Sequence, residues 1–326
     1  MRFRSTSSLR AGVAAVLLAA GLSTAAFAYP TKPITIIVPF PAGAGPDVVA
    51  RLLAERLGPQ LKESIVVENR PGASGMVGAT AVARSPADGH TLLLTPNTLF
   101  IAPHLTAGDA KPPVDVIADF EPVIMPSQTT MVMVANPKLG VKTAREFADL
   151  AKKQTISYAS SGNGSVLHIA GALFASSAGV SMTHVPYRGI APAVTDVIAG
   201  HVQVTFAGLA PVTQHVNSGA LTALAVLDPK RSPSMANVPT AIEQGFSDVA
   251  VEGWYAVLAP KGTPRDVVQR LNKELNAILA SAEAKQKIEQ TGEVVLGGTP
   301  DDLAKRMKAD YDRYGEIVRR LKITAE

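Results

Sequence analysis

ITIIVPFPAGAGPDVVARLLAERL, residues 34–57, carries a β-branched strand, a glycine-rich turn and a helix in direct succession. The strand is expected at Ile34–Phe40, and the turn follows it at once. Four apolar residues then recur at helical spacing and form one face of the helix, namely Val49, Leu52, Leu53 and Leu57. Pro46 suits a first helical turn, and Gly58-Pro59 ends the helix. This succession is the repeating unit of an α/β layer.

Short apolar runs and segments of helical period alternate along the rest of the chain. We expect further strands at residues 64–69, 91–95, 131–135, 155–158, 182–185, 202–206, 221–226 and 254–260. We expect helices at residues 144–152, 166–176, 191–199, 266–281, 284–291 and 300–321. The 326 residues exceed the ~100 to 200 of a usual single domain. The sequence therefore predicts an α/β protein of two domains.

The N-terminus has the composition of a secretory signal. Arg2, Arg4 and Arg10 precede an uncharged apolar run at residues 11–22, and Ala26-Phe27-Ala28 places small residues at a cleavage site. A membrane-anchoring helix is the alternative, but it needs about 20 apolar residues and this run is shorter. We expect residues 1–28 to be removed after Ala28 and the protein to act outside the cytoplasm.

Charge and composition argue against several functions. Removing residues 1–28 takes away three arginines and no acids, which lowers the formal charge from +4 to +1 and leaves no basic footprint for nucleic acid. The chain has no cysteine, and its six histidines lack the spacing of a zinc site. We expect no metal, no cofactor and no nucleic-acid partner.

Two turns of the first strand series are candidates for binding an anion. Phe40-Pro41-Ala42-Gly43 and the following residues lead into a helix, whose exposed N–H groups and dipole attract negative charge. Asp47 is expected to cap that helix, and an ordinary strand–helix turn is the alternative for the whole segment. Thr95 and Asn97 offer a hydroxyl and an amide at the end of another strand.

The second series holds the strongest candidate. Ser160-Ser161-Gly162-Asn163-Gly164-Ser165 leads into a helix that carries His168, with Ser165 as the expected N-cap. Backbone amides and hydroxyls in such a turn can surround a carboxylate. The turn lacks the Gly-Lys-Ser/Thr ending of a nucleotide loop. His168 either contacts the ligand or fixes the loop.

Two further segments end strands of this series. Tyr187-Arg188-Gly189 supplies a phenol and a guanidinium, which can bind a carboxylate with two parallel hydrogen bonds. Tyr187 and Phe206 offer apolar walls. A surface arginine and core aromatic rings are the alternatives.

Catalysis is the rival interpretation of Ser165 and His168. Three residues apart on one helical turn they can touch, yet no Gly-x-Ser-x-Gly elbow surrounds the serine. The spacing fits a helix cap better than a hydrolase. We therefore expect a binding protein, not an enzyme.

Taken in order, the motifs resemble those of the substrate-binding receptors of tripartite tricarboxylate transporters, the Bug family. The matching segments run through almost the whole chain after residue 28: Lys32-Pro33-Ile34, Val38-Pro39-Phe40-Pro41-Ala42-Gly43, residues 67–73, residues 85–89, Asp119-Phe120-Glu121-Pro122, residues 160–168, His184-Val185-Pro186-Tyr187-Arg188-Gly189, residues 238–240, Trp254, and residues 259–264.

The resemblance implies a type II periplasmic binding protein of the Venus-flytrap kind. Each domain would be a mixed, mostly parallel sheet flanked by helices, with residues 29–126 and 252–326 in domain 1 and residues 127–251 in domain 2. A small carboxylate, either a di- or tricarboxylate or an aromatic acid, would bind between them. The implied partner is a membrane permease of one large and one small subunit, and a monomer is expected. A receptor that presents its solute to a sensor kinase is the alternative.

Two departures from the family pattern bear on the ligand. The family's turn usually reads Gly-Gly before the aspartate, whereas this chain has Gly43-Ala44-Gly45-Pro46. Many members also carry an aspartate after the phenylalanine that matches Phe206, and this chain has Ala207. If that acid recognises an ammonium group, its absence argues against an amino acid ligand.

Overall fold

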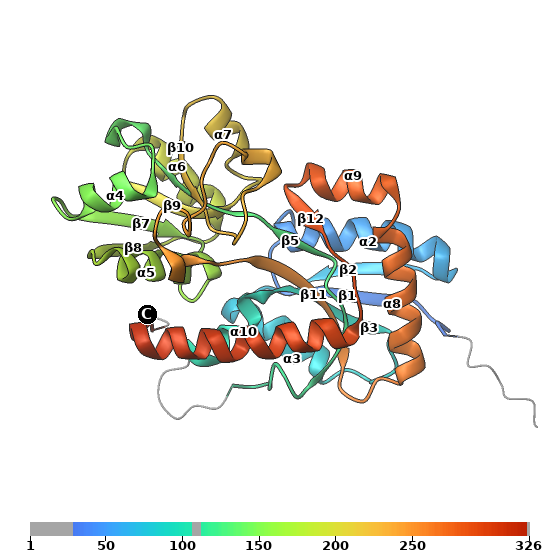
Figure 1. Cartoon of the computed structure of the whole chain (residues 1–326). Coiled ribbons are helices and arrows are strands. Elements are labelled where there is room, and N and C mark those ends of the chain that lie inside the picture. The colour runs from blue at the N-terminus through green and yellow to red at the C-terminus, as the bar shows by residue number, and fades with distance from the viewer. Residues whose placement is uncertain (1–28, 106–111, 325–326) are drawn as a thin grey trace, which may run out of the picture.

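The computed structural model describes residues 29–105 and 112–324, which form two α/β lobes that lie side by side (Figure 1). We define lobe 1 by the sheet of order β12-β5-β11-β3-β1-β2, in which β4 also pairs with β11, and lobe 2 by the sheet of order β10-β6-β9-β7-β8. The expected signal segment lies outside the described residues. Within the described ranges, no helix has the length and apolar character to cross a membrane.

Lobe 1 is built on strands from two parts of the chain, one before and one after lobe 2. They are β1 (Ile34–Val38), β2 (Ile65–Asn69), β3 (Thr91–Pro96), β4 (Phe120–Ile124), β5 (Ser127–Thr129), β11 (Gly253–Pro260) and β12 (Glu293–Val295). Its helices are α2 (Gly45–Leu61), α3 (Met76–Ala83), α8 (Arg265–Leu279), α9 (Ala282–Gln290) and α10 (Pro300–Leu321), with short turns η1 (Ala73–Gly75), η2 (Asn97–Phe100) and η3 (Ala102–Leu105). Separate apolar clusters on the two faces of the sheet form the core.

Lobe 2 is built from one continuous part of the chain. Its strands are β6 (Met131–Ala135), β7 (Ile156–Ser160), β8 (Met182–Pro186), β9 (Val204–Gly208) and β10 (Thr222–Val226). Its helices are α4 (Ala144–Ala151), α5 (Val166–Ala178), α6 (Ile190–Ala199) and α7 (Thr213–Asn217), with short turns η4 (Pro137–Leu139), η5 (Pro233–Met235) and η6 (Ser247–Val249). Apolar clusters again cover both faces of the sheet.

The predicted fold, two mixed α/β sheets flanked by helices, is confirmed, with one correction to the pairing. Parallel pairs join β1 to β2 and β3 in lobe 1, and β7 to β8 and β9 in lobe 2. The other pairs among the described strands are antiparallel, so the sheets are not mostly parallel. The reason is that β11 and β6, which enter from the other lobe, run against their neighbours.

Two segments connect the lobes. The chain leaves lobe 1 between β5 and β6 at Thr130, and it returns just before β11, where Val251 still packs in the lobe 2 core. Helix α10 is a third link, because it runs from beneath lobe 1 to beneath α5 (Figure 1). Its last turns pack Tyr314, Ile317 and Val318 into the lobe 2 cluster. The boundaries at residues 126 and 252 stay a prediction, and α10 spans both lobes.

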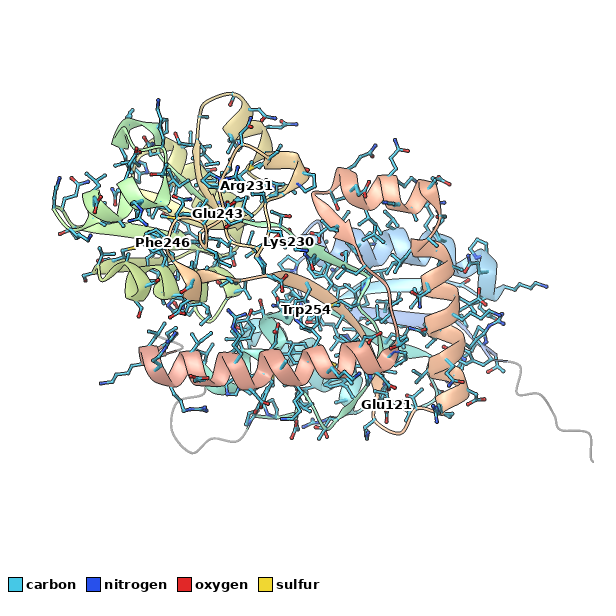
Figure 2. All side chains as sticks on the ribbon, in the orientation of Figure 1. Glu121, Lys230, Arg231, Glu243, Phe246 and Trp254 are labelled. Carbon is cyan, nitrogen blue, oxygen red and sulfur yellow. The ribbon has the colours of Figure 1, made fainter. Side chains whose placement is uncertain are left out.

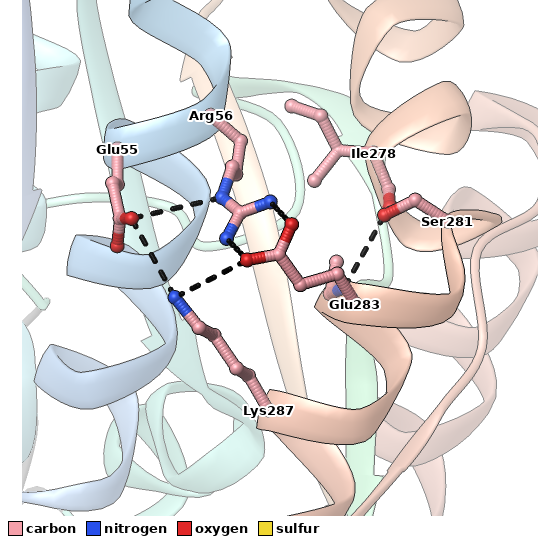
Figure 3. Close-up of polar contacts among 7 residues, drawn as sticks. Glu55, Arg56, Ile278, Ser281, Glu283 and Lys287 are labelled. Carbon is pink, nitrogen blue, oxygen red and sulfur yellow. Dashed lines mark hydrogen bonds and ion pairs between the residues drawn. The ribbon is translucent and has the colours of Figure 1, made fainter.

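Surface ion pairs tie α2 to α9 on the outside of lobe 1 (Figure 3). Arg56 donates two hydrogen bonds to Glu283, with distances of 2.6 and 2.5 Å. Lys287 lies 3.5 Å from Glu55 and 3.8 Å from Glu283. Because the carboxylates and Lys287 are solvent-exposed, water and salt screen these pairs, and they contribute little to stability. The buried leucines of α2 and α8, not these pairs, hold this side of the lobe together.

Candidate functional site

The candidate turns lie at the carboxyl ends of parallel strands. Because β1 runs parallel to β3, and β7 runs parallel to β8 and β9, the strands of each group end at the same edge of their sheet. In lobe 1 this edge carries the turn at residues 39–44 and the start of η2. In lobe 2 it carries the turns at residues 161–165 and 187–189. Open α/β sheets bind ligands at this edge.

The first turn of lobe 1 is shaped by Asp47, though not as a helix cap. The N-cap of α2 is Ala44, and Asp47 lies inside the first helical turn. Its buried carboxylate accepts hydrogen bonds from the N–H of Gly43 at 2.8 Å, from Arg51 and from Asn69. Burial by itself would raise the pKa of Asp47, but these hydrogen bonds lower it. The carboxylate therefore folds the turn back on α2, so Asp47 does not cap the helix, and it supports the turn as the family resemblance implies.

This turn offers backbone donors to a ligand. Within the described chain, no hydrogen bond uses the N–H of Ala42 or that of Gly45, and both residues are exposed. They lie at the positive end of the α2 dipole. Gly45 packs against Tyr255, since a Cβ at this position would lie 2.3 Å from the phenol oxygen. The departure from the family's Gly-Gly pattern thus still leaves a glycine where the backbone meets β11.

Thr95 and Asn97 are buried, and their polar groups are already used. The Thr95 hydroxyl donates to the carbonyl of Pro96 at 3.2 Å. The Asn97 amide donates to the carbonyl of Glu252 at 3.0 Å and to the Tyr314 hydroxyl at 3.3 Å. Asn97 therefore ties η2 to the returning segment and to α10. The structure gives these two residues a structural role and does not support the predicted ligand contacts.

The turn of lobe 2 has the cap that the sequence predicts. Ser165 is the N-cap of α5, and its hydroxyl oxygen accepts from the N–H of His168 at 3.2 Å while the hydroxyl donates to the carbonyl of Gly162 at 2.8 Å. Gly162 and Gly164 have φ angles of 127° and 70°, which favour glycine. Neither the hydroxyl nor the N–H of Ser161 has a hydrogen-bond partner among the described residues.

The hydroxyl of Ser165 and the ring of His168 have separate partners. The ring nitrogen Nδ1 of His168 accepts from the N–H of Gly164 at 3.1 Å, whereas Ser165 is occupied with the cap. No hydrogen bond joins the serine hydroxyl to the imidazole in the described structure. This geometry fits a fixed loop and lacks the activated nucleophile of a hydrolase.

Two aromatic residues that sequence reasoning missed lie behind this turn. His184, on β8, stacks on His168 with ring centres 3.8 Å apart, and Tyr158, on β7, stacks on His184 at 4.9 Å. His184 Nε2 lies 2.6 Å from the hydroxyl oxygen of Ser160. Burial lowers the pKa of both histidines to about 4, and for His168 the nearby His184 adds to the effect. The His184-Val185-Pro186 motif was visible in the sequence, but nothing there places it against residue 168.

Gly171 makes room for this stack, which gives a testable prediction. Alanine in a helix is normally favoured over glycine by about 1 kcal/mol. A Cβ at Gly171, however, would lie 2.1 Å from the buried ring of Tyr158. We expect Gly171→Ala to lower the free energy of unfolding by about 1–3 kcal/mol in chemical denaturation. Ser177→Ala, at an exposed position of the same helix, is the control and should be neutral or slightly stabilising; equal stabilisation by both changes would contradict the packing argument.

The remaining candidates of lobe 2 differ in what they can reach. Arg188 is exposed and has no ion-pair partner among the described residues. Gly189 begins α6 with a φ of 109°. The Tyr187 hydroxyl donates to Asp196 at 2.6 Å, and burial, together with this carboxylate, raises the pKa of Tyr187 to about 12. Phe206 is fully buried against Tyr158 and Phe174, so it is a core residue and the predicted wall role is wrong for the structure described.

The lobes contact each other on both sides of the sheet edges that carry the candidate turns. A Cβ on Gly164 would lie 1.9 Å from Leu105 of η3, and η3 packs on η1, which lies beside Phe40. On the other side, a Cβ on Gly292 would lie 2.7 Å from Ala210, which follows β9. Gly292 precedes Glu293, the partner of Tyr255 beneath the Gly45 turn. The turns at residues 39–44 and 161–165 are thus both tied to inter-lobe contacts.

Comparisons with known proteins agree with this arrangement. Residues 49–323 match the model of the tripartite tricarboxylate transporter family receptor. The protein BugT of Bordetella pertussis is 35% identical over 293 residues, which cover 89% of this chain and 90% of BugT.

Among solved structures, the periplasmic binding protein BugD is similar at 34% identity and a TM-score of 0.80, covering 91% of this chain and 99% of BugD. Rpa4515 of R. palustris with adipate has 31% identity and a TM-score of 0.83, with coverage of 91% and 99%. MatC of Rhodopseudomonas palustris with bound malate has 28% identity and a TM-score of 0.79, with coverage of 89% and 100%. The family that the sequence motifs resembled is confirmed: this chain belongs to the tripartite tricarboxylate transporter receptors, the solute-binding proteins of the Bug family.

Proposed function

We propose that this protein is a periplasmic solute receptor that binds a small carboxylate between the turn at residues 39–44 and the turn at residues 161–165. Two turns with hydrogen-bond donors that are free within the described chain, one on each lobe, are the observation that carries the proposal. The lobes contact each other on both sides of these turns. Two similar proteins, solved with adipate and with malate, support a carboxylate as the ligand class. Family membership supports the periplasmic location.

The donors suit a ligand with a carboxylate at one end and a second polar or anionic group at the other. In lobe 1 the N–H groups of Ala42 and Gly45 receive one carboxylate, with the α2 dipole behind them. In lobe 2 the N–H and hydroxyl of Ser161 serve the other end, and Arg188 supplies the positive charge. A dianion then meets donors from both lobes and favours the closed arrangement.

Ala207, on β9, favours a ligand that has a carboxylate and no ammonium group. Ala207 is fully buried in an apolar cluster with Val132, Val134 and Leu209. No carboxylate stands at this position to pair with an amine. We therefore infer a di- or tricarboxylate or an aromatic acid as the ligand, in preference to an amino acid.

A thermal-shift series tests the binding proposal. Adipate, malate, citrate, benzoate and glutamate are each added at increasing concentration. A true ligand at a hundredfold excess over Kd stabilises the fold by about 2.7 kcal/mol, which raises Tm by several degrees. Arg188→Gln should weaken the response about tenfold in concentration, whereas Arg84→Gln, another exposed arginine remote from the turns, should leave it unchanged. No shift with any acid would refute the proposal.

Delivery to a membrane permease of one large and one small subunit, by a monomeric receptor with a hinge near residues 126 and 252, is the proposed physiological role. Three outcomes separate transport, signalling and hydrolysis. Restoration of uptake by the receptor together with its permease supports transport, while ligand-dependent phosphorylation of a sensor kinase supports signalling. Ester turnover that disappears in Ser165→Ala would instead support the hydrolase.

A further inference from the structure

A stack of three rings contacts the lobe 2 turn at residues 160–165. Tyr158, His184 and His168 come from β7, β8 and α5, and the two imidazoles lie nearly parallel, 11° apart. Each imidazole holds one end of the turn. His184 contacts Ser160 at the end of β7, and His168 contacts the N–H of Gly164 just before α5. The rings therefore set the spacing between the first and the last part of the turn.

The direction of the Gly164 hydrogen bond fixes the charge of His168. A backbone N–H can only donate, so Nδ1 of His168 must be an unprotonated acceptor. The proton of the neutral ring is then on Nε2. A doubly protonated ring would lose this hydrogen bond and would turn an N–H against the N–H of Gly164.

Ser160 has a single hydroxyl proton and two acceptors within reach of it, the carbonyl of Gly162 at 3.1 Å and Nε2 of His184 at 2.6 Å. Its oxygen also accepts from the N–H of Gly162. We assign the proton to the bond with Gly162, because His184 then donates from Nε2 and all three contacts are hydrogen bonds. Because the ring centres are only 3.8 Å apart, the two imidazoles cannot both carry a charge without strong repulsion.

We propose that His168 and His184 are a positioning pair that holds the ligand turn at residues 160–165 in its binding shape only while both rings are neutral. The proposal rests on the proposed carboxylate function of that turn. The titratable groups that face the pair are Tyr158 and each imidazole itself, and burial keeps both histidines neutral at pH 6–8. Affinity therefore does not vary with pH through this pair between pH 6 and 8, and it falls below about pH 5 as a ring is protonated and the turn opens.

Isosteric variants separate positioning from simple packing. In His168→Asn the amide oxygen replaces the acceptor Nδ1, and in His184→Gln the amide nitrogen replaces the donor Nε2, so each keeps one hydrogen bond but cannot be protonated. His168→Leu and His184→Leu keep apolar volume and lose the hydrogen bond. Phe174→Leu, in the core of the same lobe, is the packing control.

Affinity for adipate and malate is measured by calorimetry between pH 4.5 and 8, beside thermal unfolding of each variant. We expect the leucine variants to bind about tenfold or more weakly at pH 7 and the amide variants to bind within about threefold of the wild type. The loss of affinity below pH 5 should be present in the wild type and in Phe174→Leu, and reduced in His168→Asn. Leucine variants with wild-type affinity, or an unchanged acid loss in both amide variants, overturn the positioning role.

Imidazole ¹⁵N chemical shifts of the ligand-free protein keep this test separate from the function. We expect Nδ1 of His168 to be unprotonated and Nε2 of both rings to carry the proton at pH 7. Protonated Nδ1 in His168 overturns the inference even if carboxylates bind. The expected shifts without binding of any carboxylate overturn the proposed function, and with it the positioning of a ligand.

Discussion

Asp228→Asn and Glu293→Gln are each expected to raise the free energy of unfolding at pH 8 by on the order of 2–4 kcal/mol, and by clearly less at pH 5. Both carboxyls are buried, Asp228 just after β10 and Glu293 on β12, and they contact Met131 and Ser127 on either side of the first crossing between the lobes. Desolvation raises the pKa of each to about 7. At pH 8 the folded protein therefore holds two buried charges that the unfolded chain would expose to water.

The contacts show why the amide variants preserve the fold. Asp228 accepts from the N–H of Met131 at 3.3 Å, and Glu252 is the nearby charge that further raises its pKa. Glu293 accepts from the hydroxyls of Tyr255 at 3.2 Å and Ser127 at 3.4 Å. In Asp228→Asn the amide oxygen can accept from Met131 in the same way. In Glu293→Gln the two hydroxyls donate to different carboxylate oxygens, so the amide oxygen can keep the bond from Tyr255 while the amide NH2 donates to the hydroxyl oxygen of Ser127. Glu293 thus lies at β5 and Asp228 at the start of β6, on either side of the crossing at Thr130.

The sign follows from the direction of the pKa shifts. A carboxyl whose pKa is higher in the folded state contributes stability that is complete below its unfolded pKa near 4 and is lost as the pH rises through about 7. His168 and His184 act in the opposite direction, since their lowered pKa values contribute stability above about 6.5 that is lost as the pH falls toward 4. The two effects offset each other in the wild type, so the difference between variant and wild type is the informative quantity.

Urea unfolding at pH 5, 6, 7 and 8 measures this difference. Asp149→Asn, which removes an exposed carboxylate, is the matched control and should show a difference that varies little with pH. The argument fails if Asp228→Asn and Glu293→Gln are as destabilising at pH 8 as at pH 5.

Local patterns predicted most of the elements and the Ser165 cap. Strand β1, the turn after it and α2 all follow from residues adjacent in sequence, such as the leucines of α2 and the glycines before it. The same is true of Ser165, whose cap depends on a residue three positions away. The antiparallel direction of β11 and β6 could not be predicted from local sequence, because it depends on the path by which the chain enters each lobe.

Side-chain roles that depend on distant residues could not be read from the sequence. Asn97 has the composition of a ligand contact, yet Glu252 and Tyr314, more than 150 residues away, use its amide. Phe206 was expected to end a strand, but it lies inside β9 (Val204–Gly208) and is buried in the core. His184 and Leu105 carry no local signal of their proximity to His168 and Gly164. These errors and omissions come from tertiary contacts. The end of α2 is an error of secondary structure, because Gly58-Pro59 was expected to end the helix and α2 runs to Leu61 with Pro59 inside it.

Helix α10 is joined to the returning segment through a charged network around Arg306. Arg306 donates from Nη2 to Glu252 at 2.7 Å, its Nε lies 3.2 Å from Asp310, and its guanidinium lies 5.6 Å from the ring centre of Trp254. Trp254, on β11 beside α10 (Figure 2), donates to Asp310 at 2.7 Å. Asp310 is 4% exposed, so its charge depends on these partners. Removing the guanidinium leaves a buried carboxylate without its cation.

We expect Arg306→Ala to lower the free energy of unfolding by about 3–5 kcal/mol, measured by denaturant unfolding at pH 7. Arg320→Ala, which breaks an exposed pair with Asp248 at 3.7 Å, is the control and should cost less than about 1 kcal/mol. Adding Asp310→Asn to Arg306→Ala should recover part of the loss, because the buried charge is then gone. If the double variant is no more stable than Arg306→Ala, the loss comes from packing against Trp254 and not from the unpaired carboxylate. The network joins Glu252, Trp254 and α10, so its removal weakens the contact between the returning segment and the helix that packs on both lobes.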